Sequence, residues 1–256
     1  MQTLFSRRPR TPLVLLFAIV WLLIPLQAAH ALDFGLGALE GSGEVQREAR
    51  TVEPFRGLRL QTLARVVIRP GERDAVEVLA EGNVLPLIGT RVEHGTLVVE
   101  DSKRFKSSTA EVTITVRQIE SLDGGGATAV VAEGLRGPAL SISLGGVCAL
   151  TLKDVSVDRL HASLGGASAL KMSGSASDVS IDLGGTAAVQ AAGLEAKRVS
   201  VSGGGTAQAL VWATQSLSIS VSGAAGVRYY GVSNASVQVG GVAQVRRLGA
   251  MPPRPM

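Results

Sequence analysis

The sequence has little of the chemistry on which metalloproteins and disulfide-rich proteins depend. It contains one cysteine and three histidines among 256 residues. The lone thiol, Cys148, excludes an intramolecular disulfide framework. Neither His94 nor His161 has a partner at the spacing of a metal site, and no aspartate recurs at the fixed offset of calcium-binding glycine repeats. We therefore expect no metal and no cofactor.

Aromatic residues are also scarce. Phe, Tyr and Trp together make up 4% of the chain, whereas glycine alone contributes 31 residues. This composition favours repetitive β-structure with thin, regular cores over an enzyme with a deep aromatic pocket. There is no G-x-S-x-G elbow and no G-x-x-x-x-G-K loop, which argues against the corresponding nucleophile and phosphate chemistry.

The net charge gives no sign of a nucleic-acid partner. Of the 25 basic residues, three precede Leu32, which leaves 22 against 21 acidic residues in the rest of the chain. Binding to nucleic acid requires a clustered basic face, and a charge near +1 does not indicate one.

The first 31 residues have the features of an export signal. Three arginines within residues 7–10 precede an apolar run over residues 13–26, which is short for a membrane span. The sequence Ala-His-Ala ends at Ala31 and has a cleavage pattern, so we expect the mature chain to begin at Leu32. That chain would be periplasmic or extracellular, without membrane insertion. An uncleaved N-terminal anchor is the alternative.

The remainder is expected to form one domain with short flanking segments. Residues 32–50 are rich in glycine and predict a flexible lead. Short alternating strands are expected over residues 51–121, glycine-pair repeats over 122–247, and a proline-rich tail over 248–256.

The repeats are marked by pairs of glycines at nearly constant spacing. Successive first members are 20, 20, 19, 20, 20 and 16 residues apart when Ala224–Ala225 is taken as the sixth pair. A fixed period of this length indicates a repeat architecture. The glycine pairs are Gly125–Gly126, Gly145–Gly146, Gly165–Gly166, Gly184–Gly185, Gly204–Gly205 and Gly240–Gly241.

Each repeat consists of an alternating strand, a glycine pair, a second apolar strand and a short returning turn such as residues 153–159. One such coil cannot bury its own apolar face, but parallel coils stacked about 4.8 Å apart can. We therefore predict an all-β fold: a parallel β-solenoid, similar to a right-handed β-helix, with about seven coils and additional strands before them. Glycine at the corner permits positive φ and close backbone approach, so Gly145→Val should destabilise the adjacent coils by about a few kcal/mol.

The combination of lead and repeats resembles the bacterial family of putative auto-transporter adhesins with a head GIN domain. The resemblance covers about residues 51–247. It implies a β-helical, extracytoplasmic protein and supplies no catalytic residue. The lead has the form R-x-V-x-x-F-x-G-L-x-L, carried here by Arg50, Val52, Phe55, Gly57, Leu58 and Leu60.

The few aromatic residues of the repeats are the candidate ligand contacts. Trp212, Tyr229 and Tyr230 fall in successive coils and could form one surface patch; the alternative is that they fill or cap the core. Rows of outward serines are a second regular surface. Cys148 occupies a small, packed position. Asp158 and Asp178 could stack one coil apart, but we favour the alternative that they belong to a solvated turn.

These observations favour a non-enzymatic interaction module, adhesin-like or structural in the envelope. Its partner would be an envelope protein, a surface protein or a glycan. The alternative is a carbohydrate-active enzyme, similar to a polysaccharide lyase or hydrolase, on a β-helix. That interpretation requires a groove in which three or more charged side chains converge.

Overall fold

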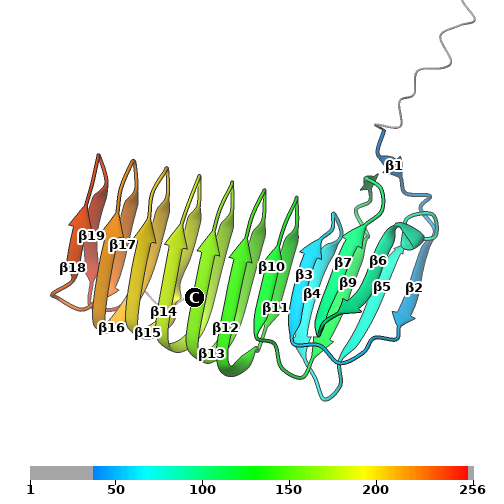
Figure 1. Cartoon of the computed structure of the whole chain (residues 1–256), viewed down its shortest axis with the longest axis horizontal. Helices are drawn as coiled ribbons and strands as arrows, with labels where there is room; N and C mark the ends of the chain where they lie inside the picture. The colour runs from blue at the N-terminus through cyan, green and yellow to red at the C-terminus, as the bar shows by residue number, and fades with distance from the viewer. Residues whose placement is uncertain (1–36, 253–256) are drawn as a thin grey trace, which may run out of the picture. The chain divides into compact units, whose positions relative to one another are not determined.

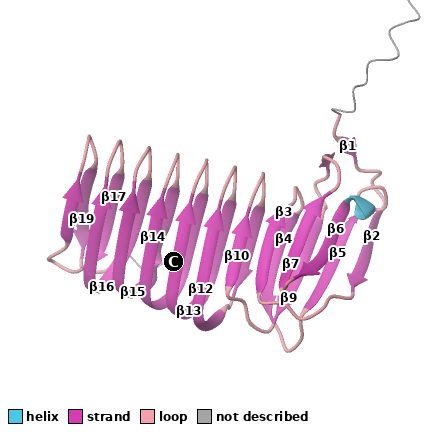
Figure 2. Ribbon diagram, in the orientation of Figure 1, coloured by secondary structure: helices cyan, strands magenta, loops and turns pink. Residues whose placement is uncertain are grey.

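The structure is a computed structural model that describes residues 37–252. The chain divides into two compact units, and the second, Ala38–Met256, contains every strand of the described residues. Strands account for nearly all of its regular structure, with one short 3₁₀ helix, η1 (Leu85–Leu87) (Figure 2). No helix within residues 37–252 is long and apolar enough to cross a membrane. The expected export signal lies outside the described residues.

The strands fall into an N-terminal group and a repeating group (Figure 1). The N-terminal group is β1 (Leu39–Glu40), β2 (Val45–Arg50), β3 (Gly57–Gln61), β4 (Arg65–Pro70), β5 (Ala75–Glu81), β6 (Ile88–Glu93), β7 (Thr96–Asp101), β8 (Phe105–Lys106) and β9 (Glu111–Val116). The repeating group is β10 (Ser121–Gly124), β11 (Ala129–Glu133), β12 (Arg136–Leu144), β13 (Ala149–Leu164), β14 (Ala169–Leu183), β15 (Ala188–Gly203), β16 (Gln208–Val221), β17 (Gly226–Gly231), β18 (Ser236–Val239) and β19 (Gln244–Gly249).

Strands β10 to β19 form a parallel β-solenoid, which confirms the predicted fold. Each strand pairs in parallel with the strand one coil later, so that Leu150 lies opposite Leu170 and Leu170 opposite Val189. The coils stand side by side from β10 to β19 in Figure 1. The seven corners bound about six complete turns, close to the expected number.

Each coil has three sides rather than two strands joined by a turn. In the coil of β13 the first side points Leu150 and Leu152 inward, and the second side points Val155 and Val157 inward. The third side contributes three inward residues that end at Leu164. Alternation is interrupted between 152 and 155 and again between 157 and 160, and each interruption is a corner. The returning turn expected over residues 153–159 is therefore wrong, because its valines form the second side.

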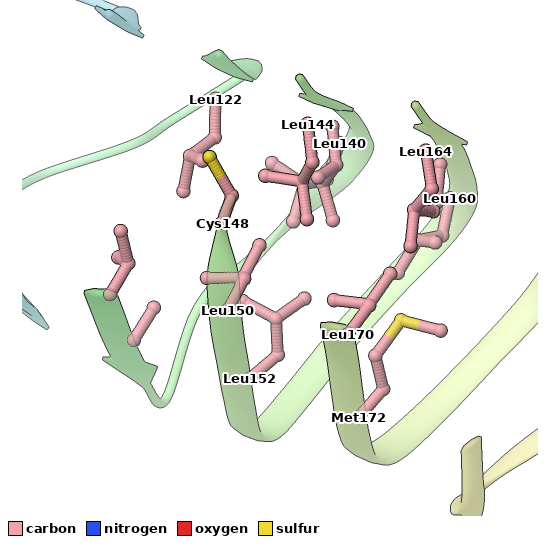
Figure 3. Packing of buried hydrophobic residues seen from close by; sticks show 14 of the residues in the cluster. Leu122, Leu140, Leu144, Cys148, Leu150, Leu152, Leu160, Leu164, Leu170 and Met172 are labelled. Carbon is pink, nitrogen blue, oxygen red and sulfur yellow. The ribbon is translucent and has the colours of Figure 1, made fainter. Parts of the chain in front are cut away.

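The core is a set of apolar columns that run through the stack. Leu140 and Leu144 from one coil lie beside Leu160 and Leu164 from the next (Figure 3). All four side chains are at most 3% exposed. Burial of a leucine contributes about 1.5–3 kcal/mol, so the repeated columns are the main source of stability.

The second glycine of each pair makes the corner. Gly146 has φ +82°, and a Cβ there would lie 2.5 Å from the carbonyl oxygen of Gly126 in the preceding coil. Gly145 has neither constraint, since its φ is not positive and a Cβ would meet nothing within 4 Å. The expectation that Gly145→Val would strain a positive φ is therefore wrong, and Gly146 is the sensitive position.

The sixth corner is also shifted by two residues from its predicted place. Gly223, with φ +82°, packs against the backbone of Gly205, and Val221 pairs with Gly203. Ser222–Gly223 therefore occupies the slot assigned to Ala224–Ala225. The corner keeps its glycine, and the spacing of second glycines becomes 18 residues on each side of Gly223.

The N-terminal strands extend the stack and cover its first end. Strand β3 lies between β7 and β10, and β4 lies between β9 and β11, all in parallel. Strands β5 and β6 then pair antiparallel with β9 and β7. Residues 45–50, expected in a flexible lead, instead form β2, which pairs antiparallel with β5.

Candidate functional site

The three predicted aromatic residues divide between surface and core. Trp212 and Tyr230 are register partners across β16 and β17, and both are half-buried. Tyr229 faces inward and is 7% exposed. Strand alternation explains the division, because consecutive residues point to opposite faces. The surface interpretation thus holds for Trp212 and Tyr230, and the core interpretation holds for Tyr229. A binding role for Trp212 and Tyr230 stays a prediction.

Trp212 and Tyr230 line a groove along the first side of the coils. Its volume is about 810 Å³, within the range of roughly 300–1,000 Å³ typical of ligand sites. We call this site the aromatic groove. Its lining is formed by Thr151, Leu152, Lys153, Lys171, Met172, Ser173, Gln190, Ala192, Gly193, Leu210, Trp212, Tyr230, Met251 and Pro252.

A counting rule explains why these residues meet. Each of the seven repeat corners is turned by one glycine with positive φ. The fifth and seventh residues after that glycine point outward from the first side of the coil. From Gly205 these are Leu210 and Trp212, and from Gly223 they are Arg228 and Tyr230. Stacked coils bring equal positions into one column, so that Lys171, Gln190, Leu210 and Arg228 are successive register partners.

Small residues in the middle coils hollow the surface. Ser173 and Gly193 are register partners, and a Cβ on Gly193 would lie 3.1 Å from the Cβ of Ser173. Ala192 lies beside them. The larger Trp212 and Tyr230 follow in the next two coils, and the difference in side-chain size produces the concavity.

The charges of the aromatic groove have one sign. Lys153 and Lys171 belong to the lining, and no acidic residue does. Among the described residues neither lysine forms an ion pair. The lysines, Leu210 and the Met251–Pro252 segment were not singled out from the sequence, although the counting rule would have placed the first three.

A second concavity lies on the third side of the coils and is lined by serines. Its volume is about 800 Å³, and we call it the serine wall. Its central column places Ser141, His161, Ser180, Ser200, Ser218 and Ser236 in successive register.

The aspartate that lines the serine wall, Asp178, is already paired with an arginine. Asp178 lies in register between Arg159 and Arg198. Arg198 donates two hydrogen bonds to Asp178, one of them 2.6 Å long from Nη2 to Oδ2. Hydrogen bonding to Arg198 lowers the pKa of Asp178. Asp158 does not stack on Asp178, since arginines are the register partners of Asp178 in both neighbouring coils.

The lone cysteine is a structural residue, as predicted. Cys148 is 4% exposed, and its thiol lies 2.9 Å from the carbonyl oxygen of Gly145. Thr128 and Ser168 make the equivalent contact to the first glycine of their own corners, at 2.7 and 2.6 Å. The column therefore holds small hydrogen-bonding residues under successive corners. Within residues 37–252 no group of three His, Cys, Asp or Glu side chains could hold a metal ion.

Stacked parallel coils with ligand-sized concavities on two outer faces define the fold of the described residues as a β-solenoid. The chain belongs to the family described as putative auto-transporter adhesin, head GIN domain, whose model matches residues 54–233. This confirms the resemblance drawn from the lead and the repeats. No curated protein matches the chain.

Solved structures share the fold at low sequence identity. A putative adhesin from Bacteroides fragilis has a TM-score of 0.75 and 19% identity, over 82% of this chain and 100% of its own. A putative lipid binding protein from Parabacteroides distasonis has a TM-score of 0.68 and 14% identity, over 83% and 100%. A putative adhesin from Parabacteroides merdae has a TM-score of 0.66 and 16% identity, over 82% and 99%. The protein is accordingly adhesin-like in family and fold.

Proposed function

We propose that the protein is a non-enzymatic, exported interaction module that binds a component of the cell envelope or of another surface through the aromatic groove. The observation that carries the proposal is the pairing of Trp212 with Tyr230 beside a concavity of about 810 Å³. Partly exposed aromatic rings of this kind are the usual anchors of binding surfaces. Membership of an adhesin family supports the same assignment.

Export is part of the proposal and is supported by the sequence. The basic, apolar and small-residue segments of residues 1–31 are ordered as in a signal peptide. Cleavage after Ala31 would release a chain that contains the whole compact unit from Ala38.

The enzyme alternative depends on the serine wall, where Arg159, Asp178 and Arg198 converge. Glycoside hydrolysis requires two carboxylates, one of which must hold a proton near neutral pH. Asp178 is bound by Arg198, which lowers its pKa and favours the ionised form. Asp182 accepts a hydrogen bond from Ser202 and lies 3.7 Å from Nε2 of His161. The chemistry of this cluster supports a structural ion pair over an acid catalyst.

The test is binding of the chain from Leu32 to glycan arrays and to envelope fractions. Trp212→Ala combined with Tyr230→Ala should lower affinity by at least about 30-fold, because an anchoring aromatic residue typically carries about 2 kcal/mol. His161→Ala, on the serine wall, is the matched control and should bind normally. Unchanged binding by the double variant, or its loss in the control alone, would refute the assignment of the groove.

A further inference from the structure

We propose that the aromatic groove binds an acidic amphiphile, with its apolar chain along the rings and its anionic head at the two lysines. This inference rests on the proposed function and names the chemical class of the ligand. The lining divides into a basic part and an apolar part, and the two lie in different coils of the stack.

The apolar part suits a hydrocarbon chain. Leu210 and Trp212 lie in β16, Tyr230 lies in β17, and Met251 and Pro252 complete the lining. Met251 is 64% exposed although it is a large apolar side chain. A flexible thioether and half-buried rings adapt to an unbranched chain, and covering them would remove apolar surface from water.

The basic part suits a single anionic head. Lys153 and Lys171 come from neighbouring strands, and no carboxylate in the lining competes for them. A lysine is a flexible point charge that accepts a carboxylate or a phosphate without the fixed fork of arginine. Lys171 and Trp212 are two coils apart, roughly 10 Å along the stack, so head and chain can be engaged together.

The polar lining is too sparse to select a sugar by its hydroxyl groups. The uncharged polar groups of the groove are those of Thr151, Ser173 and Gln190, together with the hydroxyl of Tyr230 and the indole N–H of Trp212. Specific recognition of several hydroxyl groups requires a matching set of fixed donors and acceptors. The largely apolar lining therefore favours an acyl chain over a glycan in this groove.

Trp212 provides a direct measurement. The sequence has two tryptophans, at 21 and 212, so the chain from Leu32 retains Trp212 alone. We would titrate this chain with dodecanoate, dodecyl phosphate, dodecanol and inorganic phosphate and follow its fluorescence. Both anionic amphiphiles should give a saturable change, with dodecanol about tenfold weaker and inorganic phosphate without effect. A preference between the two anions identifies the head group.

Two variants separate the parts of the site. Lys153→Gln with Lys171→Gln should weaken both anions about tenfold, to the level of dodecanol. Lys103→Gln with Lys197→Gln removes the same charge outside the groove and should change nothing. Ala192→Phe should block all three amphiphiles, with its unfolding transition measured to confirm that it folds.

Equal affinity for dodecanol and the two anions, or no saturable response of Trp212, would overturn the ligand class. If that happened while the Trp212 and Tyr230 double variant still lost envelope binding, the proposed function would stand with another ligand. Amphiphile binding without groove-dependent envelope binding would instead refute the proposed function and leave the ligand site.

Discussion

Single glycines in this protein differ sharply in what they tolerate. At Gly146 the backbone has φ +82°, and a Cβ would lie 2.5 Å from the carbonyl oxygen of Gly126. At Gly145, one residue earlier, a Cβ would meet nothing within 4 Å. Both residues look identical in the repeat pattern. Only the conformation of the corner separates them, and the pattern predicts a glycine pair without telling which member turns the chain.

We therefore predict that Gly146→Ala lowers the free energy of unfolding by at least about 2 kcal/mol, through positive φ and the backbone contact. Gly145→Ala should change it by no more than about 0.5 kcal/mol. Denaturant unfolding of the two variants provides the comparison. Equal losses would show that the corner geometry is wrong.

A half-buried carboxylate predicts a pH dependence. Asp101 accepts hydrogen bonds from Oγ1 of Thr62 at 2.7 Å and from the amide of Leu63 at 2.6 Å, at a corner that has no glycine. Burial raises its pKa above the ordinary value of 3.8. The folded state then holds the proton more tightly than the unfolded state. The stabilisation from this group is greatest below pH 3.8 and is lost as pH rises through the folded pKa.

The check is the difference in unfolding free energy between the wild type and Asp101→Asn, measured from pH 3 upward in steps. The free energy of unfolding of the wild type should exceed that of the variant most at the acid end, and the difference should shrink as pH rises. An advantage that grows with pH would mean that the hydrogen bonds from Thr62 and Leu63 outweigh burial.

At the scale of the element, inward-facing positions that are buried in β16 become exposed in β18, in the last coil. Ile219 in β16 is 1% exposed, whereas its register partner Val237 in β18 is 42% exposed. Val239 repeats the pattern, at 47% against 4% for Val221. Among the described residues no strand covers β18 on its far side, so the last coil buries only part of its apolar face.

Substitution at these two sites should therefore have different costs. Ile219→Ala should lower the free energy of unfolding by about 2–5 kcal/mol, and Val237→Ala by less than about 1 kcal/mol. Thermal and denaturant unfolding test the pair. If Val237→Ala lowered the free energy of unfolding as much as Ile219→Ala, β18 would have to be covered in solution.

The sequence pattern predicted the parallel stack, its period and its small corner residues, because each depends on local alternation and on the spacing of the glycines. It did not predict the second side of the coil. Val155 and Val157 are inward residues on a side too short to alternate for long, and the pattern there resembles a turn. Coil length varies at this side, which is why counting from the first glycines misplaced the corner at Gly223.

For the whole molecule, the order of the N-terminal strands could not be foreseen. Leu58 in β3 pairs with Leu97 in β7 and with Leu122 in β10, so a strand early in the chain lies between two later ones. Such pairing depends on contacts over tens of residues and leaves no local signal. In the aromatic groove, Trp212 was foreseeable, but the contribution of Met251 and Pro252 requires the path of the chain after β19.

The central claim is that the aromatic groove, and not the serine wall, meets the binding partner. Gln190 and Ser200 test it directly, because both are exposed on β15 and face different sides of the same coil. A photo-crosslinking residue placed at 190 should capture envelope material on illumination, while the same residue at 200 should not. Capture at 200 with none at 190 would contradict the account and move the binding surface to the serine wall.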